Sequence, residues 1–341
     1  MAAQIIGLDI GRSYVKVVQV KVDGEKKTLM AAATVPVVVD AVKSEAPDDL
    51  KKVSAAIENC VRSAKVSGEH CVVSIIESQA VTRLVEMPNL TDKELSAAIS
   101  WEADQYIPLP LKDVNLHYVV ISRPETNTGT GKMSVLLVAA PKRVIKKYSD
   151  IVRGANLTIV ALETESSALA RALTKKADPA TLIVSLGGSS TEIILARSGN
   201  VLFSRSLASG GQTLTKAVMS EFNLTSSQAE QYKIAYGLLE DKLSGKIGAV
   251  LRPILDILAG EILKAADFAR THVENSQVAR MIICGGGAYL LGLPQYLAEK
   301  TSIEVSVADP WQDFTKDGLV LKMPGQGSFY CIATGLCLHG S

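Results

Sequence analysis

Residues 5–16 carry the side chains of this chain that are best suited to chemistry. An apolar run ends at Asp9, and Gly11, Ser13 and Lys16 follow before the sequence turns apolar again. The pattern predicts a strand, a tight turn and a second strand, and the backbone N–H groups of such a turn can surround an anion. Ser13 can donate to a phosphate oxygen and Lys16 adds positive charge, while Asp9 can hold the water shell of a magnesium ion. An ordinary N-terminal β-hairpin would carry the same short glycine motif.

The second half of the chain repeats this pattern at residues 181–195, where a strand, a Gly/Ser turn and a second strand are predicted. An offset of 176 residues, from 11 to 187, aligns Gly187 with Gly11 and places Ser185 at the position of Asp9. Such internal similarity indicates a duplicated α/β unit. Two facing lobes can present their turns to one ligand in the cleft between them, and two such turns are harder to explain by chance than one.

Two further groups of residues can contribute to the same site. Residues 285–287 are three consecutive glycines after a predicted buried strand, and glycine lets the backbone approach a flat ligand or another backbone closely. The alternative is a tight strand-to-helix turn with nothing bound. Glu230 and Lys233 lie three residues apart on one face of a predicted helix, where they form either a surface ion pair or a contact to a ribose and base.

Composition restricts the class of protein. The 341 residues exceed the usual size of one domain, so roughly two to four subdomains are expected. Hydrophobic residues make up 47% and charged residues 21%, which is typical of a globular protein and not of a disordered one. The formal net charge is +1, so bulk electrostatics favours neither nucleic acid nor acidic lipid. We find no secretory signal and no apolar run of about 18 residues, and we expect no direct membrane insertion.

Cysteine and histidine usage indicates neither a metal site nor a disulfide framework. The five cysteines are scattered and odd in number, which predicts reduced, buried thiols. The four histidines are far apart, and no cysteine and histidine cluster has the spacing of metal ligands.

Hydrophobic periodicity predicts strands that alternate with helices, and therefore an α/β fold. Residues 81–154 differ, because their order β-α-β-β-α indicates a small α+β insert. The first helix of the insert begins at a capping box, Thr91 with Glu94, in which both side chains bind otherwise unpaired backbone amides. Thr225 and Gln228 form a second capping box in a region of predicted helices.

The order and spacing of these motifs resemble the actin/Hsp70/sugar-kinase ATPase superfamily over nearly the whole chain. Residues 9–16 resemble its first phosphate motif, residues 186–191 its second phosphate motif, and residues 282–289 its adenosine motif. Residues 327–338 resemble its second connecting helix. Each motif is loose, but together they are fairly specific.

Within the superfamily, the insert is similar to the 1C subdomain of the cell-division protein FtsA, and the whole chain resembles the PilM family of type IV pilus assembly proteins. Residues 85–88, 102–110, 229–233 and 334–336 resemble segments of that family. The sequence ends at Ser341 without the amphipathic membrane tail typical of FtsA, which favours the pilus family.

The resemblance implies an α/β fold of the actin-like, two-lobed ATPase type, with duplicated α/β subdomains and an FtsA-type 1C insert. The expected subdomains are 1A at residues 1–80, 157–178 and 325–341, 1C at 81–156, 2A at 179–209 and 276–324, and 2B at 210–275.

The resemblance also implies ATP or ADP, with magnesium, in the cleft between the lobes. The residues expected to bind the nucleotide are Asp9, Gly11, Arg12, Ser13, Tyr14, Lys16, Gly187, Gly188, Ser189, Ser190, Thr191, Gly210, Gly211, Glu230, Lys233, Gly285, Gly286, Gly287 and Tyr289. Asp9 is expected to hold the magnesium ion through water. Glu163 and Glu165 lie near the first connecting segment and are the candidates for a catalytic residue.

One departure from the family pattern concerns hydrolysis. The second phosphate motif usually begins with an Asp, whose carboxylate helps to hold the waters of the metal and to orient attack on the γ-phosphate. Ser185 stands at that position and supplies no negative charge. We therefore expect nucleotide binding with slow or absent hydrolysis.

The function implied is that of a cytoplasmic scaffold, peripheral at the inner membrane through a partner. Its 1C side would bind the N-terminal cytoplasmic peptide of a PilN-type bitopic membrane protein, and the pilus motor ATPases and further copies of the chain are additional expected contacts. Two alternatives are an actin-like filament-forming or cell-division protein and a phosphotransferase of the same superfamily. The missing membrane tail counts against a division role, and Ser185 counts against a kinase.

Overall fold

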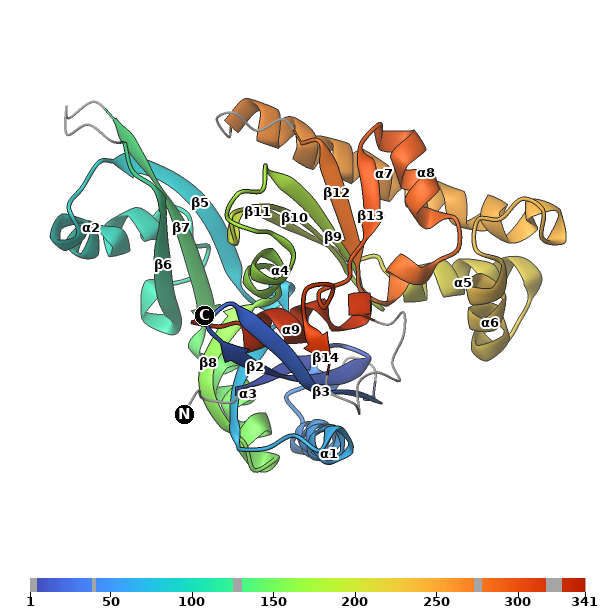
Figure 1. Cartoon of the computed structure of the whole chain (residues 1–341), viewed down its shortest axis with the longest axis horizontal. Helices are drawn as coiled ribbons and strands as arrows, with labels where there is room; N and C mark the ends of the chain where they lie inside the picture. Colours follow the sequence, from blue (N-terminus) through green and yellow to red (C-terminus); the bar gives the residue numbers. More distant parts are fainter. Residues whose placement is uncertain (1–4, 39–40, 125–130, 273–277, 317–326, 341) are drawn as a thin grey trace.

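The computed structural model describes residues 5–38, 41–124, 131–272, 278–316 and 327–340, in which three β-sheets are packed with helices (Figure 1). Two sheets are large, with six and five strands, and the third has three strands. Together they form the mixed α/β architecture that the sequence predicts.

The first lobe is built around the N-terminal strand. Its strands are β1 (Ile6–Ile10), β2 (Tyr14–Asp23), β3 (Lys26–Pro36), β4 (His70–Ile75), β8 (Thr158–Thr164) and β14 (Thr315–Lys316), and its outer helices are α1 (Pro47–Ala64) and α3 (Lys142–Gly154). The strand order is β14-β3-β2-β1-β4-β8, with β1 antiparallel to β2 and parallel to β4. All residues of β1 are buried, because helices cover the sheet on both faces at this point.

The second lobe repeats the same topology. Its strands are β9 (Thr181–Leu186), β10 (Thr191–Arg197), β11 (Asn200–Leu207), β12 (Arg280–Cys284) and β13 (Glu304–Val307), and its helices are α5 (Gly211–Phe222), α6 (Ser226–Tyr236), α7 (Lys246–His272) and α8 (Leu293–Thr301). The order β11-β10-β9-β12 corresponds to β3-β2-β1-β4 of the first lobe, including the parallel pairing of the last two strands. The repeat seen in the sequence is therefore a repeat of strand order and direction as well as of a turn.

The insert is a separate antiparallel unit with its own core. It contains β5 (Val81–Pro88), α2 (Asp92–Asp104), β6 (Val114–Ser122) and β7 (Lys132–Pro141), with the strand order β5-β7-β6. The predicted capping box is present at the start of α2, where the Thr91 N–H donates to Glu94 Oε2 at 2.9 Å and the Glu94 N–H donates back to Thr91 Oγ1 at 3.4 Å. The insert projects from the first lobe beside the second lobe (Figure 1).

Short 3₁₀ turns connect these elements and several of them reach the sites described below. They are η1 (Ala41–Lys43), η2 (Glu77–Gln79), η3 (Leu111–Asp113), η4 (Leu243–Gly245), η5 (Gly286–Tyr289) and η6 (Gly327–Tyr330).

Two helices, α4 (Glu165–Leu173) and α9 (Cys331–Cys337), lie between the two large sheets (Figure 1). Helix α9 packs on β1, β2 and β4 of the first lobe, whereas α4 packs on β10 and β11 of the second. Two glycines permit this close stacking. A Cβ at Gly7 would lie 1.9 Å from the Ala333 carbonyl oxygen, and a Cβ at Gly335 would lie 1.9 Å from the Ala168 carbonyl oxygen. Backbone therefore rests directly on backbone from β1 through α9 to α4.

Element boundaries depart from the sequence prediction where a single residue turns the chain. The apolar spacing predicts a helix over residues 48–67, but α1 ends at Ala64 because Lys65 adopts a left-handed φ of 54°. The sequence also predicts a long helix over residues 247–275, with Pro253 marking either a kink or a late start. Helix α7 begins at Lys246, so the late start is wrong. Its last predicted residues lie outside the described part of the chain.

Replacing Gly335 with Ala should lower the free energy of unfolding by about 2–3 kcal/mol, because the added methyl group forces α9 away from α4. Gly260→Ala is the matched control. Gly260 also lies in a helix, α7, but a Cβ there meets no atom within 4 Å, and the substitution should stabilise the chain by about 0.5–1 kcal/mol. Urea denaturation of both variants measures the difference. Equal stability of the two variants would show that the α4–α9 contact is not a packing constraint.

Candidate functional site

A cavity of about 940 Å³ lies between the two lobes and is lined by the three glycine turns that the sequence singled out. The first lobe contributes the β1–β2 turn, and the second lobe contributes the β9–β10 turn and the loop after β12. Helices α5 and α6 close the cavity from the side. The topology explains this convergence, because β1, β9 and β12 all end at the cleft.

The first turn is held by its own backbone and by a buried ion pair. The Gly11 N–H donates to the Tyr14 carbonyl oxygen at 3.0 Å. Lys16 Nζ lies 2.8 Å from Asp9 Oδ2, and Ser74 Oγ donates to Asp9 Oδ1 at 3.2 Å. Both oxygens of this buried carboxylate therefore accept hydrogen bonds, which fixes its orientation at the end of β1.

The second turn reproduces the first at the predicted offset. The Gly187 N–H donates to the Ser190 carbonyl oxygen at 2.9 Å, which is the counterpart of the bond from Gly11 to Tyr14. Ser189 Oγ is buried and has no hydrogen-bond partner within the described residues. A buried hydroxyl in this state is expected to find a ligand atom or a water, because leaving it unpaired is costly.

The two turns approach each other directly. Arg12 donates to the Ser189 carbonyl oxygen at 3.3 Å across the lobes, and Gln212 Nε2 donates to Ser13 Oγ at 3.2 Å. A Cβ at Gly188 would lie 2.8 Å from Ser13 Oγ, so only glycine permits the observed distance between the turns. Sequence reasoning missed Gln212, although the preceding Gly210-Gly211 pair marked the place where α5 begins.

The third turn closes the cavity with backbone alone. Gly285 has a φ of 80°, and a Cβ there would lie 2.6 Å from the Leu186 carbonyl oxygen. Its N–H donates to the Ser328 carbonyl oxygen at 2.9 Å, which ties the turn to η6 in the first lobe. The predicted close approach is therefore one of backbone to backbone, with Gly286, Gly287 and the half-exposed Tyr289 on the cavity side.

Glu230 and Lys233 both line the cavity and form an ion pair of 2.7 Å. Lys233 is 8% exposed, whereas the side chain of Glu230 is 45% exposed, so the pair lies half-buried at the edge of the cavity. Lys233 Nζ also donates to Thr215 Oγ1 at 3.0 Å and to the Gly211 carbonyl oxygen at 3.2 Å. The pair thereby links α6 to the beginning of α5.

Two of the predicted nucleotide-binding residues support the turns from behind and do not line the cavity. Thr191 is buried, and its hydroxyl donates to the Ser209 carbonyl oxygen at 2.7 Å. Gly210 caps α5, and a Cβ there would lie 2.6 Å from the Gly187 carbonyl oxygen. Both residues hold the second turn against α5.

The two candidate catalytic acids lie in different places. Glu165 begins α4 and lines the cavity, and its Oε2 accepts the Glu77 N–H at 3.1 Å. Glu163 does not line the cavity, because it is held by Arg171 at 2.9 Å and by His339. Of the two candidate catalytic acids, Glu165 is therefore the one that a ligand in this cavity could contact.

Glu192 is a cavity residue that sequence reasoning missed. It lies at the start of β10, is 4% exposed, and accepts a hydrogen bond from Ser206 Oγ at 2.9 Å. Burial, and then the nearby Glu77 carboxylate, raise the pKa of Glu192 to about 7. Burial also raises the pKa of Glu165, together with the charges of Glu192 and Asp9. The floor of the cavity is therefore a buried acidic region next to two phosphate-type turns.

The polar groups that line this cavity fit an anion that is accompanied by a hydrated cation. The unpaired Ser189 hydroxyl is a donor for the anion, and the unpaired Glu192 Oε2 is an acceptor for the waters of the cation. Within the described ranges, no group of three or more histidine, cysteine or acidic side chains could ligate a metal directly. Mg²⁺ does not require such a group, because it usually binds through one or two carboxylates and keeps several of its waters.

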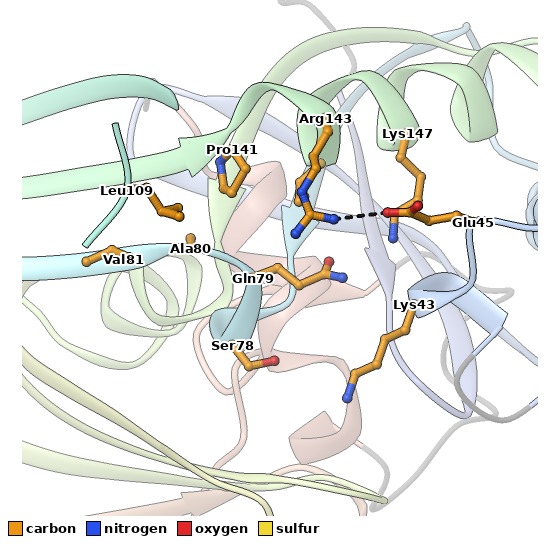
Figure 2. A pocket seen from close by; sticks show the side chains of 11 residues that line it. Lys43, Glu45, Ser78, Gln79, Ala80, Val81, Leu109, Pro141, Arg143 and Lys147 are labelled. Atoms are coloured by element: carbon orange, nitrogen blue, oxygen red, sulfur yellow. Dashed lines mark hydrogen bonds and ion pairs between the residues drawn. The ribbon is translucent and has the colours of Figure 1, made fainter. Parts of the chain in front are cut away.

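A second cavity, of about 460 Å³, lies where the first lobe meets the insert (Figure 2). Arg143 and Lys147 extend into it from α3, Gln79 from η2, and Lys43 from η1 (Figure 2). Arg143 pairs with Glu45 at 2.9 Å, and burial lowers the pKa of Lys147. Apolar side chains, Val81, Leu109, Pro141 and Val144, complete the lining. The charged residues come from two segments that are distant in sequence, and the uncharged Gln79 comes from a third.

One buried tyrosine fixes the wall of this second cavity. Tyr148 of α3 accepts the Ile76 N–H at 3.3 Å and donates to Gln79 Oε1 at 3.2 Å, so it holds both ends of η2. Ile76 lines the cavity between the lobes, whereas Gln79 lines the second one. The two cavities are thus separated by a single short turn.

Residues 7–341 match the model of the family described as type IV pilus assembly protein PilM. A solved PilM-PilN type IV pilus biogenesis complex contains a chain that is 25% identical, with a TM-score of 0.84 and coverage of 100% of this chain and 99% of that chain. MreB 5 of Spiroplasma citri, solved with AMPPNP bound, has a TM-score of 0.53 at 15% identity, with coverage of 100% and 96%. This second likeness concerns the fold alone.

The ethanolamine utilization protein EutJ of Escherichia coli (strain K12) is 24% identical over 113 residues. These residues are 33% of this chain and 36% of that protein, so the chain spans about a third of the length of this curated relative. Within the described residues, no helix has the length and apolar character that crossing a membrane requires.

The raised pKa of Glu192 predicts a pH-dependent stability difference. As pH rises from the ordinary value of 4.5 through about 7, the buried side chain loses its proton unfavourably, and the folded state loses stability. Glu192→Gln removes this cost, so at pH 8 it should unfold with a free energy about 2–3 kcal/mol higher than that of the wild type. Below about pH 4.5 the difference should vanish.

Thermal or urea unfolding across this pH range measures the difference in unfolding free energy between the two proteins. This difference includes the accompanying change at Glu165, because the charge of Glu192 raises the pKa of Glu165. Exposed Glu304→Gln controls for the substitution itself. If the unfolding free energies of wild type and Glu192→Gln differ by the same amount at all pH values, the pKa of Glu192 is not raised in the folded state.

Proposed function

The chain belongs to the family of the type IV pilus assembly protein PilM, and we propose that it is an ATP-binding scaffold at the cytoplasmic face of the pilus inner-membrane complex. In this role it binds the N-terminal cytoplasmic segment of a PilN-type membrane protein. The observation that carries the proposal is the presence of two separate cavities, one between the lobes and one between the first lobe and the insert. Each suits a different class of ligand.

The cavity between the lobes suits a nucleotide. The two similar turns supply backbone N–H groups and the Ser13 and Ser189 hydroxyls for phosphate oxygens. Glycines after β12 leave room for a flat base against backbone, and the fixed Glu230–Lys233 pair lies where a ribose and base would be contacted. The likeness to an MreB protein solved with AMPPNP supports the fold for this role.

Magnesium, when bound, would neutralise phosphate charge, and Asp9 would hold its water shell. Asp9 is already oriented by Lys16 and Ser74, so it would hold a hydrated ion through water. Ser185 lies in the cavity but carries no charge, and Glu165 is buried with a raised pKa. This combination favours binding over rapid hydrolysis.

The second cavity suits a short peptide segment. Its lining combines apolar side chains with Arg143, Lys147 and Glu45, which can bind both the backbone and the side chains of an extended segment. One solved structure that matches this chain over nearly its whole length is a PilM-PilN complex. A PilN-type segment bound here would hold the scaffold at the membrane and leave the second lobe accessible to the pilus motor ATPases.

Filling the second cavity should block the peptide. Ala80→Phe places a ring in the lining and should weaken binding of a peptide from the N-terminus of the PilN-type partner by at least about tenfold, which is about 1.4 kcal/mol. Ala97→Phe is the control, because Ala97 is exposed on α2 of the same insert and does not line the cavity. Fluorescence anisotropy of the labelled peptide gives the two affinities. Unchanged affinity in Ala80→Phe would exclude this cavity as the peptide site.

Hydrolysis should be slow in the wild-type protein. With saturating Mg-ATP, phosphate release should remain at least ~100-fold below the roughly 10 s⁻¹ that is typical of enzymes. A continuous phosphate assay measures the rate, with Asp9→Asn as the variant that distinguishes the site from contaminating activity. Fast release that disappears in Asp9→Asn would make the protein an ATPase rather than a nucleotide-dependent scaffold.

A further inference from the structure

The strand register of the two hairpins gives Glu192 a defined counterpart in the first lobe. In the first hairpin Lys16 lies directly opposite Asp9, and in the second hairpin Glu192 lies directly opposite Ser185. The offset between Lys16 and Glu192 is again 176 residues, the same as between Asp9 and Ser185. Directly opposed residues of an antiparallel pair share one face and have neighbouring Cβ atoms. The carboxylate absent from β9 is therefore present one strand away, on the facing residue.

The surroundings of Glu192 distinguish it from two other buried acids, Asp9 and Glu77. Asp9 uses both oxygens to accept hydrogen bonds from Lys16 and Ser74. Glu77 accepts from Ser166 and from Ser204, across the lobes, and is not part of the cavity lining. These two carboxylates are thus already satisfied by protein donors.

One carboxylate oxygen of Glu192 has no hydrogen-bond partner among the described residues. Its carboxylate accepts a hydrogen bond at Oε1 from Ser206 Oγ at 2.9 Å, and a hydrogen bond from the Ser190 side chain lowers its pKa, while Oε2 is buried and has no hydrogen-bond partner among the described residues. The side chain is 4% exposed and lines the nucleotide cavity. A buried carboxylate oxygen without a hydrogen-bond partner, on a residue that lines a cavity, calls for a positively charged or strongly donating ligand. Ser185 beside it adds a hydroxyl that can orient a water.

We propose that Glu192 replaces the missing Asp of the second phosphate motif and, with Asp9 from the opposite lobe, positions the hydrated divalent cation that accompanies the nucleotide. This inference rests on the proposed nucleotide function and deepens it. Glu192 acts through the waters of the cation and does not contact the nucleotide, so it is a positioning residue. Compared with the family pattern, the carboxylate lies on β10 instead of β9, and the site still has one acid from each lobe.

The proposal predicts that the gain in nucleotide affinity due to magnesium depends on Glu192. A fluorescent ATP analogue is titrated into the full chain with excess Mg²⁺ and, separately, with EDTA. The ratio of the two Kd values is the readout. Glu192→Gln should reduce this ratio by at least about tenfold, while its Kd in EDTA stays equal or improves because a negative charge near the phosphates is removed. Exposed Glu304→Gln of the same lobe should keep the wild-type ratio.

A double variant tests whether a carboxylate at position 185 can replace the carboxylate at position 192. In the double variant Ser185→Asp with Glu192→Gln, the carboxylate returns to the facing residue of the hairpin, and the magnesium-dependent ratio should recover to within about threefold of wild type. Binding of the PilN-type peptide at the remote second cavity verifies that each variant is folded.

The possible outcomes distinguish the proposed nucleotide function from the proposed role of Glu192. A wild-type chain that binds the peptide but no nucleotide would overturn the nucleotide function and this inference with it. A wild-type chain that binds nucleotide more tightly with Mg²⁺, together with a Glu192→Gln variant of unchanged ratio, would overturn the inference alone. Loss of the ratio in Glu192→Gln without recovery in the double variant would overturn the claimed replacement of position 185.

Discussion

The cleft depends on the contact between two similar turns, one from each lobe. Gly188 approaches Ser13 so closely that any side chain would collide with the hydroxyl, and Arg12 and Gln212 add hydrogen bonds across the same gap. Because β1 and β9 end at this contact, their facing residues Lys16 and Glu192 are brought to the cavity as well. The contact therefore depends on the spacing of the two large sheets that carry these turns.

That spacing is set by the stack of α9 and α4, in which two glycines allow backbone to rest on backbone. Helix α4 begins at Glu165 in the cavity, and Glu165 accepts the N–H of Glu77 in η2. The same turn η2 forms a wall of the second cavity and is held there by Tyr148. A nucleotide in one cavity and a peptide in the other would thus contact opposite sides of one rigid connection. A scaffold needs this kind of stable link more than it needs fast hydrolysis.

The sequence predicted those parts of the site that consist of a few consecutive residues, namely the glycine turns. Glycine turns after apolar strands are recognisable because the backbone geometry restricts which residues fit, and the repeat at a constant offset made them convincing. Tertiary neighbours were not predictable in the same way. Glu163 and Glu165 are two residues apart, yet only the fold decides that Arg171 and His339 hold the first and that the second faces the cavity. The second cavity combines η1, η2 and α3, which no sequence pattern links. Glu192 was within reach, since pairing the predicted hairpin strands places it opposite Ser185.

The central claim is that the two cavities bind two different ligands in a single chain. Backbone hydrogen exchange, measured with Mg-ATP alone and with the PilN-type peptide alone, tests it most directly. The account predicts that the nucleotide slows exchange in residues 9–16, 185–191 and 285–289, whereas the peptide slows exchange in residues 78–81 and 142–147. Protection of residues 185–191 by the peptide, or of residues 142–147 but not 9–16 by the nucleotide, would contradict the assignment of the two sites.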